Sequence, residues 1–390
     1  MKKRLLILLA ACALSITGCG NEIDKQNDTN NEKSTDIESD IDSESNINDE
    51  SSNDKGSNTG NESSIDKESS IDKEKSTDSE TGNDSERSTD DSNISPESLL
   101  DVVTPGSFCF KDLKEQSFTF SSGAGAWSTE LYIFEDGYFK GLFHDSDMGS
   151  IGEGYSNGTV YCSSFYGHFA EPVMIDDYTF EFEIKDLKYR NTPGTTEISF
   201  IDNVRYEYSD AYGLEGTKKF LIYLPGKAID DFDPDVASWI LPLFYRDSDV
   251  LEEYVIVNEA TLGAMYSEPY DLISSTELTH SSCLESNSYM RDLLNDGSLC
   301  QGDCNYVAIT MYENMDYDLN CIWDAIKYTC DSDTYNKLLP EQRQWIVFKE
   351  NEAEAAAAGN EGGTLYDQVY YGRLAKLTLD RCNELIKYLQ

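Results

Sequence analysis

The segment from Gly20 to Glu97 contains no Phe, Tyr or Trp, and this absence limits what that part of the chain can fold into. Ser, Asp, Asn, Glu, Thr and Lys fill it, with a few isolated Ile residues. Such a composition cannot bury enough apolar surface to offset the entropy lost on ordering. The segment carries 24 acidic and seven basic residues, and a charged linker extends by self-repulsion. We therefore predict that residues 19–97 form a disordered acidic spacer.

The first 18 residues have the pattern of a secretory signal peptide. Met1-Lys2-Lys3-Arg4 is basic, and an apolar run follows from Leu5 to Leu14. This run is much shorter than the ~20 residues that a membrane-spanning helix needs. We therefore predict that residues 1–18 are removed as a signal peptide.

Cys19 follows the small residue Gly18, and Ile16 lies three positions before it. This arrangement resembles the lipobox of bacterial lipoproteins. The resemblance implies diacylglycerol on the Cys19 sulfur, cleavage before Cys19, and a protein held by its lipid on the outer face of the cell membrane. The acidic spacer would then lift the rest of the chain through a Gram-positive cell wall. The alternative is a secreted protein whose cysteine is incidental.

The remainder of the chain is also strongly acidic. Residues 98–390 contain 50 acidic and 20 basic residues. Such a charge argues against nucleic acid as a partner, and against an anionic membrane surface beyond the lipid anchor. It favours a cationic partner.

Eight cysteines lie beyond Cys19. Secretion permits disulfides, and an even number fits pairing, but spacing does not give the connectivity. Cys300 and Cys304 are four residues apart without two nearby histidines, so no zinc site is predicted. The eight are Cys109, Cys162, Cys283, Cys300, Cys304, Cys321, Cys330 and Cys382.

Residues 105–266 read as an antiparallel β domain. In residues 180–184, apolar side chains alternate with Glu181 and Glu183, which predicts one buried and one exposed face. Asp136-Gly137 predicts a hairpin with a type I′ turn, and residues 235–240 predict one short helix. About eight strands in this length suit an up-and-down, lipocalin-like barrel or a compact sandwich, and we favour the barrel. The predicted strands are 118–120, 129–134, 138–143, 160–169, 180–184, 197–208, 220–224 and 254–257.

Two segments of this domain have alternative interpretations. The small-residue run Ser121–Trp127 either lets a ligand approach closely or closes one barrel end, with Trp127 in the core; we favour closure. His144–Asp147, with His168 as a possible partner, resembles a cation site only in part. We predict an exposed polar loop there, and no metal or cofactor.

Residues 271–390 read as a small helical bundle. An apolar stripe runs from Ala308 to Ile326 at steps of three and four, which predicts a long amphipathic helix. Asp331-Ser332-Asp333 should end it. Pro340 fits the first turn of a second helix, and the stripe from Ala375 to Leu389 predicts a third. The fold class is therefore multidomain α+β, with a disordered tether, a β-barrel-like domain and a three-helix bundle.

An ordered set of polar and small residues in this region resembles the lysozyme-inhibitor LprI-like domain of bacterial lipoproteins. The resemblance covers residues 300–390. Cys304 stands where Met is common and Lys349 where Arg is common. The cysteines often found early and late in the family are not clearly matched, although Cys382 lies near the late one, and this brings any conserved disulfide into question. The matching residues are Gln301, Asn305, Asp316, Leu319, Asn320, Gln342, Trp345, Gly362, Gly363, Thr378 and Arg381.

These residues have mainly structural interpretations. Asp316 and Asn320 lie one helical turn apart, and with Arg381 they would form a charge-assisted cluster that fixes helix register. Trp345 would anchor the core, and Gly362-Gly363 would end a helix. A functional role would require these residues to be exposed around a groove.

No catalytic site is predicted, because the chain has three His and neither a Gly-x-Ser-x-Gly nor a His-Glu-x-x-His motif. The leading hypothesis is a surface-anchored lipoprotein that binds a cationic extracellular protein, with lysozyme inhibition as the concrete form. The alternatives are a protein that binds a small ligand or glycan in the β-domain cavity, and a structural envelope module.

Overall fold

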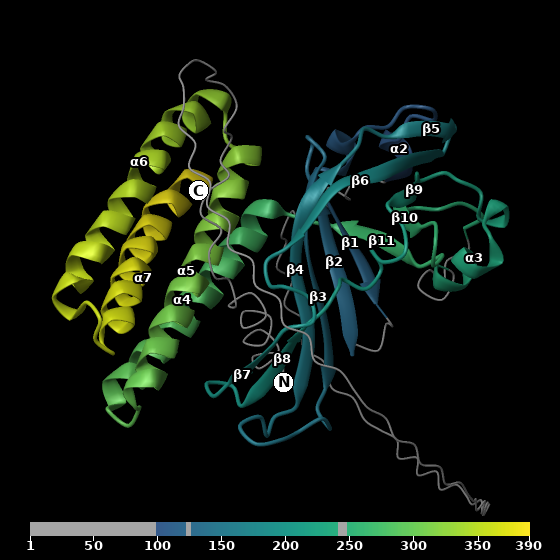
Figure 1. Ribbon diagram of the computed structural model, residues 1–390. Helices are drawn as coiled ribbons and strands as arrows, with labels where there is room; N and C mark the ends of the chain where they lie inside the picture. The colour runs from purple at the N-terminus through teal and green to yellow at the C-terminus, as the bar shows by residue number, and fades with distance from the viewer. Residues whose placement is uncertain (1–98, 122–125, 241–247) are drawn as a thin grey trace, which may run out of the picture. The chain divides into compact units, whose positions relative to one another are not determined.

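The computed structural model describes residues 99–121, 126–240 and 248–390. The predicted signal peptide (residues 1–18), the lipid site Cys19 and the spacer up to residue 97 lie outside the described residues, as does part of the Ser121–Trp127 segment. The described residues belong to one compact unit. In chain order, they form a β-barrel and then a bundle of helices (Figure 1).

Eight antiparallel strands close into an up-and-down barrel, as predicted. Neighbours along the chain pair with one another, β4 pairs with β6 across one connection, and β11 returns to pair with β1. The strands are β1 (Gln116–Ser121), β2 (Trp127–Ile133), β3 (Tyr138–Asp147), β4 (Thr159–Phe169), β6 (Thr179–Tyr189), β9 (Lys219–Tyr223), β10 (Val255–Asn258) and β11 (Ala264–Pro269).

Short elements extend this barrel. β5 (Val173–Asp176) pairs with β6, and β8 (Val204–Tyr208) runs parallel to the first half of β4, with β7 (Thr196–Ser199) beyond it. The predicted single strand at 197–208 is thus wrong, because a turn with Asn203 at positive φ divides it into β7 and β8. The helical pieces are α2 (Leu99–Val102), η1 (Phe110–Leu113), η2 (Ile229–Asp231) and α3 (Pro234–Ile240), the last at the predicted place.

The hairpin between β2 and β3 is confirmed, but its turn type is not. A type I′ turn needs positive φ at both Asp136 and Gly137, and only Gly137 has it, with φ of 78°. The Phe134 N–H donates to the Tyr138 carbonyl, and the Gly137 N–H donates to the Phe134 carbonyl. The loop between the two strands is therefore three residues long, and its last residue, Gly137, takes the left-handed conformation.

The barrel interior is filled mainly by phenylalanine. The alternation predicted for β6 is confirmed, because Phe180, Phe182 and Ile184 are buried while Glu183 is exposed. Gly141 on β3 makes room for this packing, since a Cβ there would lie 2.3 Å from the Phe165 ring. The rings that pack together in the interior include Phe110, Phe118, Phe120, Phe139, Phe143, Phe165, Phe169, Phe180, Phe182 and Phe220.

Four helices follow the barrel, where three were predicted. The additional helix is α4, whose buried stripe is Thr276, His280, Cys283, Asn287 and Met290. Three of these five side chains belong to Thr, His and Asn, so hydrophobic periodicity did not reveal the helix. The helices are α4 (Leu272–Asp296), α5 (Gln301–Thr329), α6 (Ser332–Ala357) and α7 (Tyr366–Leu385), with short 3-10 turns η3 (Ala358–Asn360) and η4 (Ile386–Leu389).

The break between α5 and α6 is confirmed, but Pro340 does not start the second of these helices. Asp331 caps α6 by accepting a hydrogen bond from the Thr334 N–H at 2.9 Å, so Pro340 lies well inside the helix. A proline there leaves the carbonyl of Asn336 without its helical donor. Asn336 and Pro340 are both exposed, so water can replace the missing donor.

Helix α5 contacts the barrel through polar and aromatic side chains. The Lys140 ammonium on β3 lies 2.9 Å from the Asp324 carboxylate. Near it, Tyr328 stacks on Phe134 at 4.1 Å between ring centroids. At another point, the Tyr306 hydroxyl donates to Glu197 at 2.7 Å. We call these contacts the α5–barrel junction.

None of the eight cysteines in the described residues forms a disulfide. Cys283, Cys321 and Cys382 are buried on α4, α5 and α7, and burial raises the pKa of each thiol. A thiol with a raised pKa stays protonated near neutral pH and is a poor nucleophile.

Candidate functional site

The residues that carry the family resemblance lie on α5, α6, α7 and the turn before α7. They fall into three polar groups, a pair of packing positions and a glycine turn. Leu319 and Thr378 are packing positions, 5% and 0% exposed. Gly362 takes the left-handed conformation, with φ of 72°, in the turn after η3, and the Gly363 N–H donates to the Asn360 carbonyl. This agrees with the turn predicted for the glycine pair.

The first polar group centres on Asp316. Its carboxylate lies 3.1 Å from the ammonium of Lys349 on α6, which also donates to the Tyr312 hydroxyl. The Asn320 amide donates to the Asp316 carbonyl at 2.8 Å. The Lys349 side chain is 6% exposed, so this ion pair ties α5 to α6 in a nearly dry environment.

The second polar group centres on Arg381, and it differs from the cluster we predicted. The Arg381 guanidinium donates to Gln342 on α6 at 2.9 Å and to Glu384 at 2.8 Å. No bond to Asp316 is found among the described residues, because Lys349 fills that place. The ring of Trp345 lies between the two cations. Its centroid is 5.3 Å from Lys349 Nζ and 6.0 Å from Arg381 Cζ, the central guanidinium carbon. Trp345 is half-buried and packs against the apolar core of the helices, as predicted, while its ring also contacts the two cations.

The start of α5 is fixed by amides. The Gln301 side chain donates to Asn305 at 2.9 Å and to Gln368 of α7 at 2.8 Å. The Asn305 amide in turn donates to the Thr364 carbonyl at 3.0 Å. These bonds hold the turn before α7 against α5, which is a structural role.

A further buried pair was missed from the sequence. His280 Nδ1 on α4 lies 2.7 Å from Asp318 Oδ2 on α5, and the Asp318 side chain is 0% exposed. The hydrogen bond to Asp318 raises the pKa of His280 despite burial, which opposes it. Asp318 lies between the matching residues Asp316 and Asn320, but its partner lies on α4, the helix that periodicity did not reveal.

We predicted an exposed polar loop at His144–Asp147, but this segment is the end of strand β3. Its backbone pairs with β4, and the His144 ring contacts the Ser128 hydroxyl at 3.3 Å. His168 contacts Asp186 at 3.1 Å. His168 lies six residues beyond Cys162, the residue of β4 that pairs with His144, and is therefore about 20 Å along the strand from it. Within the described residues, no group of three or more His, Cys, Asp or Glu could hold a metal ion.

Residues 297–385 match the family model described as Lysozyme inhibitor LprI. The match begins at Gly297, the left-handed C-cap of α4, and ends at Leu385, so it spans α5 to α7. The C-terminal helical region is therefore LprI-like, and the description of this family names lysozyme inhibition. No curated protein and no solved structure matches the chain.

The Asp316–Lys349 pair, the Arg381–Gln342 hydrogen bond and the His280–Asp318 pair each join two helices. These contacts agree with the structural interpretation of the residues that carry the resemblance. Among the described residues, no helix is long and apolar enough to cross a membrane.

Proposed function

We propose that the protein binds and inhibits a basic lysozyme through its helical region. The family match over α5 to α7 is the observation that carries this proposal. The anchoring that we propose, a lipid on Cys19 after removal of residues 1–18, would hold the inhibitor outside the cell, where lysozyme acts. In this account, the segment up to residue 97 sets the distance of the inhibitor from the membrane.

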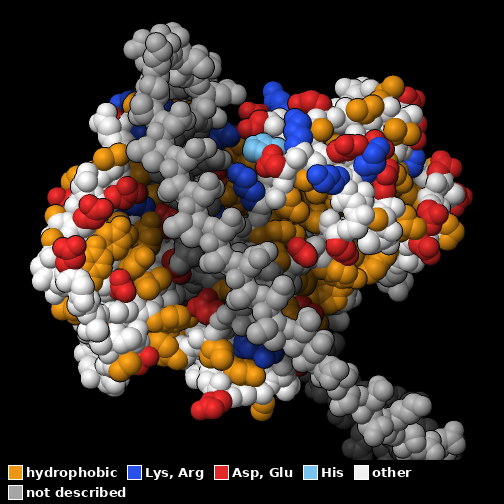
Figure 2. Space-filling view, viewed as in Figure 1, with side chains coloured by type: hydrophobic (Ala, Val, Ile, Leu, Met, Phe, Trp, Pro, Cys, Tyr) orange, Lys and Arg blue, Asp and Glu red, His pale blue; other side chains and the backbone are white. Residues whose placement is uncertain are grey.

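The charge of the helical region supports a cationic target. Residues 271–390 contain 20 acidic and nine basic residues. A negative surface steers a positive protein toward it and speeds association. Figure 2 shows acidic side chains beside exposed apolar ones on the visible face of the helices.

The outer face of α6 offers the clearest contact surface in this region. Val347 and Phe348 are neighbouring large apolar side chains on α6, and they are 59% and 48% exposed. Glu350 and Glu354 follow Val347 at helical spacing on the same side, and both are exposed. Exposed apolar and acidic side chains on the outward side of one helix suit a basic partner, and an aromatic ring such as Phe348 can supply much of the energy of a protein interface. We call these four residues the α6 face.

Substitutions on the α6 face should weaken lysozyme binding by different routes. In the full chain, we expect Phe348→Asp to raise the Kd for a basic lysozyme at least about tenfold, mainly through faster dissociation. Glu350→Lys with Glu354→Lys should slow association, with a smaller dependence on salt than in the unaltered protein. Biolayer interferometry at low and moderate salt measures both rates.

Leu278→Asp provides the matched control, because Leu278 is 60% exposed on α4, outside the family match. It should bind lysozyme like the unaltered protein. Equal affinity for all variants would rule out the α6 face, and no lysozyme binding by the unaltered protein would refute the proposed function.

A further inference from the structure

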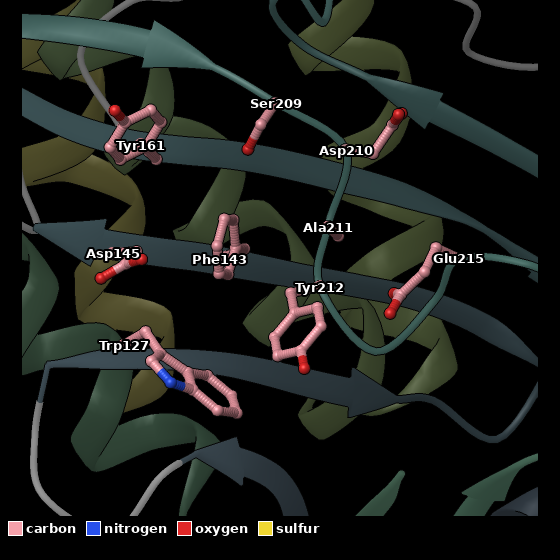
Figure 3. A pocket seen from close by; sticks show the side chains of 9 residues that line it. All are labelled: Trp127, Phe143, Asp145, Tyr161, Ser209, Asp210, Ala211, Tyr212 and Glu215. Atoms are coloured by element: carbon pink, nitrogen blue, oxygen red, sulfur yellow. The ribbon is translucent and has the colours of Figure 1, made fainter. Parts of the chain in front are cut away.

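We infer that the mouth of the β-barrel binds a small organic cation, with an ammonium group held between aromatic rings and carboxylates. The site is a pocket of about 570 Å³ in the barrel region. This volume lies in the range of small-molecule sites. The inference concerns the barrel and goes beyond the function proposed for the helices. The lining residues are Trp127, Phe143, Asp145, Tyr161, Ser209, Asp210, Ala211, Tyr212 and Glu215 (Figure 3).

Strand register builds one wall of this pocket. Trp127 on β2 pairs with Asp145 on β3, and Asp145 pairs with Tyr161 on β4. Directly paired residues share a face of a sheet, so these three side chains lie side by side on neighbouring strands. Phe143, two residues before Asp145, points to the same face and is 8% exposed among the core rings. The wall thus places one carboxylate between two aromatic side chains, above an aromatic floor.

The segment 209–215 forms the opposite wall, and several hydrogen bonds fix it. The Thr129 hydroxyl donates to the Tyr212 carbonyl at 2.6 Å. The Asn258 amide donates to the carbonyls of Gly213 and Glu215 at 3.0 and 2.9 Å. The Tyr212 ring lies 4.8 Å from Trp127 in an edge-to-face arrangement and is 42% exposed. The site is therefore preformed, and it is reached from outside past Tyr212.

Every charged side chain that lines the pocket is acidic. Asp145, Asp210 and Glu215 supply three carboxylates, and the nine lining residues include no Lys, Arg or His. Within the described part of the chain, the carboxylates of Asp145 and Glu215 accept short-range backbone hydrogen bonds from Ser146 and Gly213. Asp145 and Glu215 are half-buried. Two partly buried carboxylates in one pocket repel each other, and a bound cation relieves this repulsion whereas a neutral sugar does not.

Two further features fit an ammonium ion with an organic body. The faces of Trp, Tyr and Phe attract cations, and aromatic cages recognise quaternary ammonium groups. The Ser209 hydroxyl oxygen is buried and has no hydrogen-bond partner among the described residues. It is available to a polar substituent of the ligand, such as a hydroxyl. Aromatic walls, carboxylates and this oxygen together define a cation that is partly apolar and partly polar.

Choline is the probe that tests this inference, because it joins a quaternary ammonium group to a hydroxyl. We expect isothermal titration of the full chain with choline chloride, against sodium chloride at equal ionic strength, to detect binding. The neutral isostere 3,3-dimethylbutan-1-ol, which has the same shape without the charge, should bind at least about tenfold more weakly. Phosphocholine should also bind more weakly, because its phosphate meets the carboxylates.

Variants connect any binding to the pocket. Asp145→Asn with Glu215→Gln keeps the acceptors of both backbone hydrogen bonds but removes two charges, and should weaken choline binding at least about tenfold. Asp230→Asn with Asp231→Asn is the matched control, since it makes the same charge change at exposed positions outside the pocket. Asp210→Asn, at an exposed position, provides a milder variant that should weaken binding even if the double variant fails to fold.

Three results would overturn the inference. One is no heat of binding with millimolar choline. Another is equal affinity for choline and its neutral isostere, which would show an apolar pocket without cation selectivity. The third is binding of N-acetylglucosamine in place of choline, which would make the pocket a glycan site. Lysozyme binding should be the same for the Asp145→Asn/Glu215→Gln variant and the unaltered protein, so this test is independent of the proposed function.

Discussion

Replacing Asp318 with alanine should lower the free energy of unfolding by about 3 kcal/mol. Asp318 is 0% exposed, and its carboxylate lies 2.7 Å from His280 Nδ1. The substitution leaves the ring of His280 buried without its partner and opens a small cavity between α4 and α5. Chemical denaturation at a fixed pH measures the loss. Asp292→Ala, at an exposed position on α4, is the control and should change stability by less than about 0.5 kcal/mol.

The same pair predicts a pH dependence with a definite sign. The hydrogen bond to Asp318 raises the pKa of His280. Its stabilising contribution is therefore complete below the pKa of histidine in the unfolded chain, about 6.5, and is lost as the pH rises through the higher folded pKa. The stability difference between the unaltered protein and Asp318→Ala should thus be larger at pH 6 than at pH 9. A difference that grows with pH would contradict a charged His280.

Replacing Lys140 with methionine should destabilise the α5–barrel junction by a similar amount, about 3 kcal/mol. Burial alone would lower the pKa of Lys140, but the Asp324 carboxylate outweighs it, so the pKa stands above its ordinary value. The two side chains are only 22% and 20% exposed. Without Lys140, Asp324 keeps a charge in a poorly hydrated place, and unfolding in urea should report the loss.

A double-mutant cycle separates the ion pair from packing at this junction. Asp324→Leu combined with Lys140→Met removes both charges and should recover much of the stability lost in Lys140→Met alone. Lys376→Met is the control, because its pair with Asp380 is about 60% exposed on α7. Additive losses at positions 140 and 324 would show that the ion pair contributes nothing beyond the separate side chains.

The barrel could be predicted because its strands follow local rules. Residues 180–184 alternate between apolar and acidic, and residues 160–169 form a continuous β-rich run, and both became strands of the predicted sheet. Strand β11 was missed because its pattern is irregular, with Ser267 buried and Pro269 at its end. Closure of the barrel by β4 and β6 depends on pairing across the β5 hairpin, which a local pattern does not encode.

The candidate sites depended still more on tertiary contacts. The residues of the family resemblance were placed on the correct helices, but their partners were not. Lys349 was noted only as a departure from the family pattern, yet it pairs with Asp316 in the position we had given to Arg381. The pocket of the barrel brings Trp127 and Asp145 next to Tyr212, which is far along the chain, and only register and the path of segment 209–215 create that neighbourhood.

We have proposed that the LprI-like helices make this protein a lysozyme inhibitor. The most direct measurement is the rate at which a basic lysozyme lyses bacterial cell walls at physiological salt, with increasing amounts of the full chain. An equally acidic, unrelated protein serves as the control for nonspecific charge. We predict saturable inhibition by the full chain, reduced in Phe348→Asp and absent from the control. Undiminished lysis, or equal inhibition by the control, would contradict the claim.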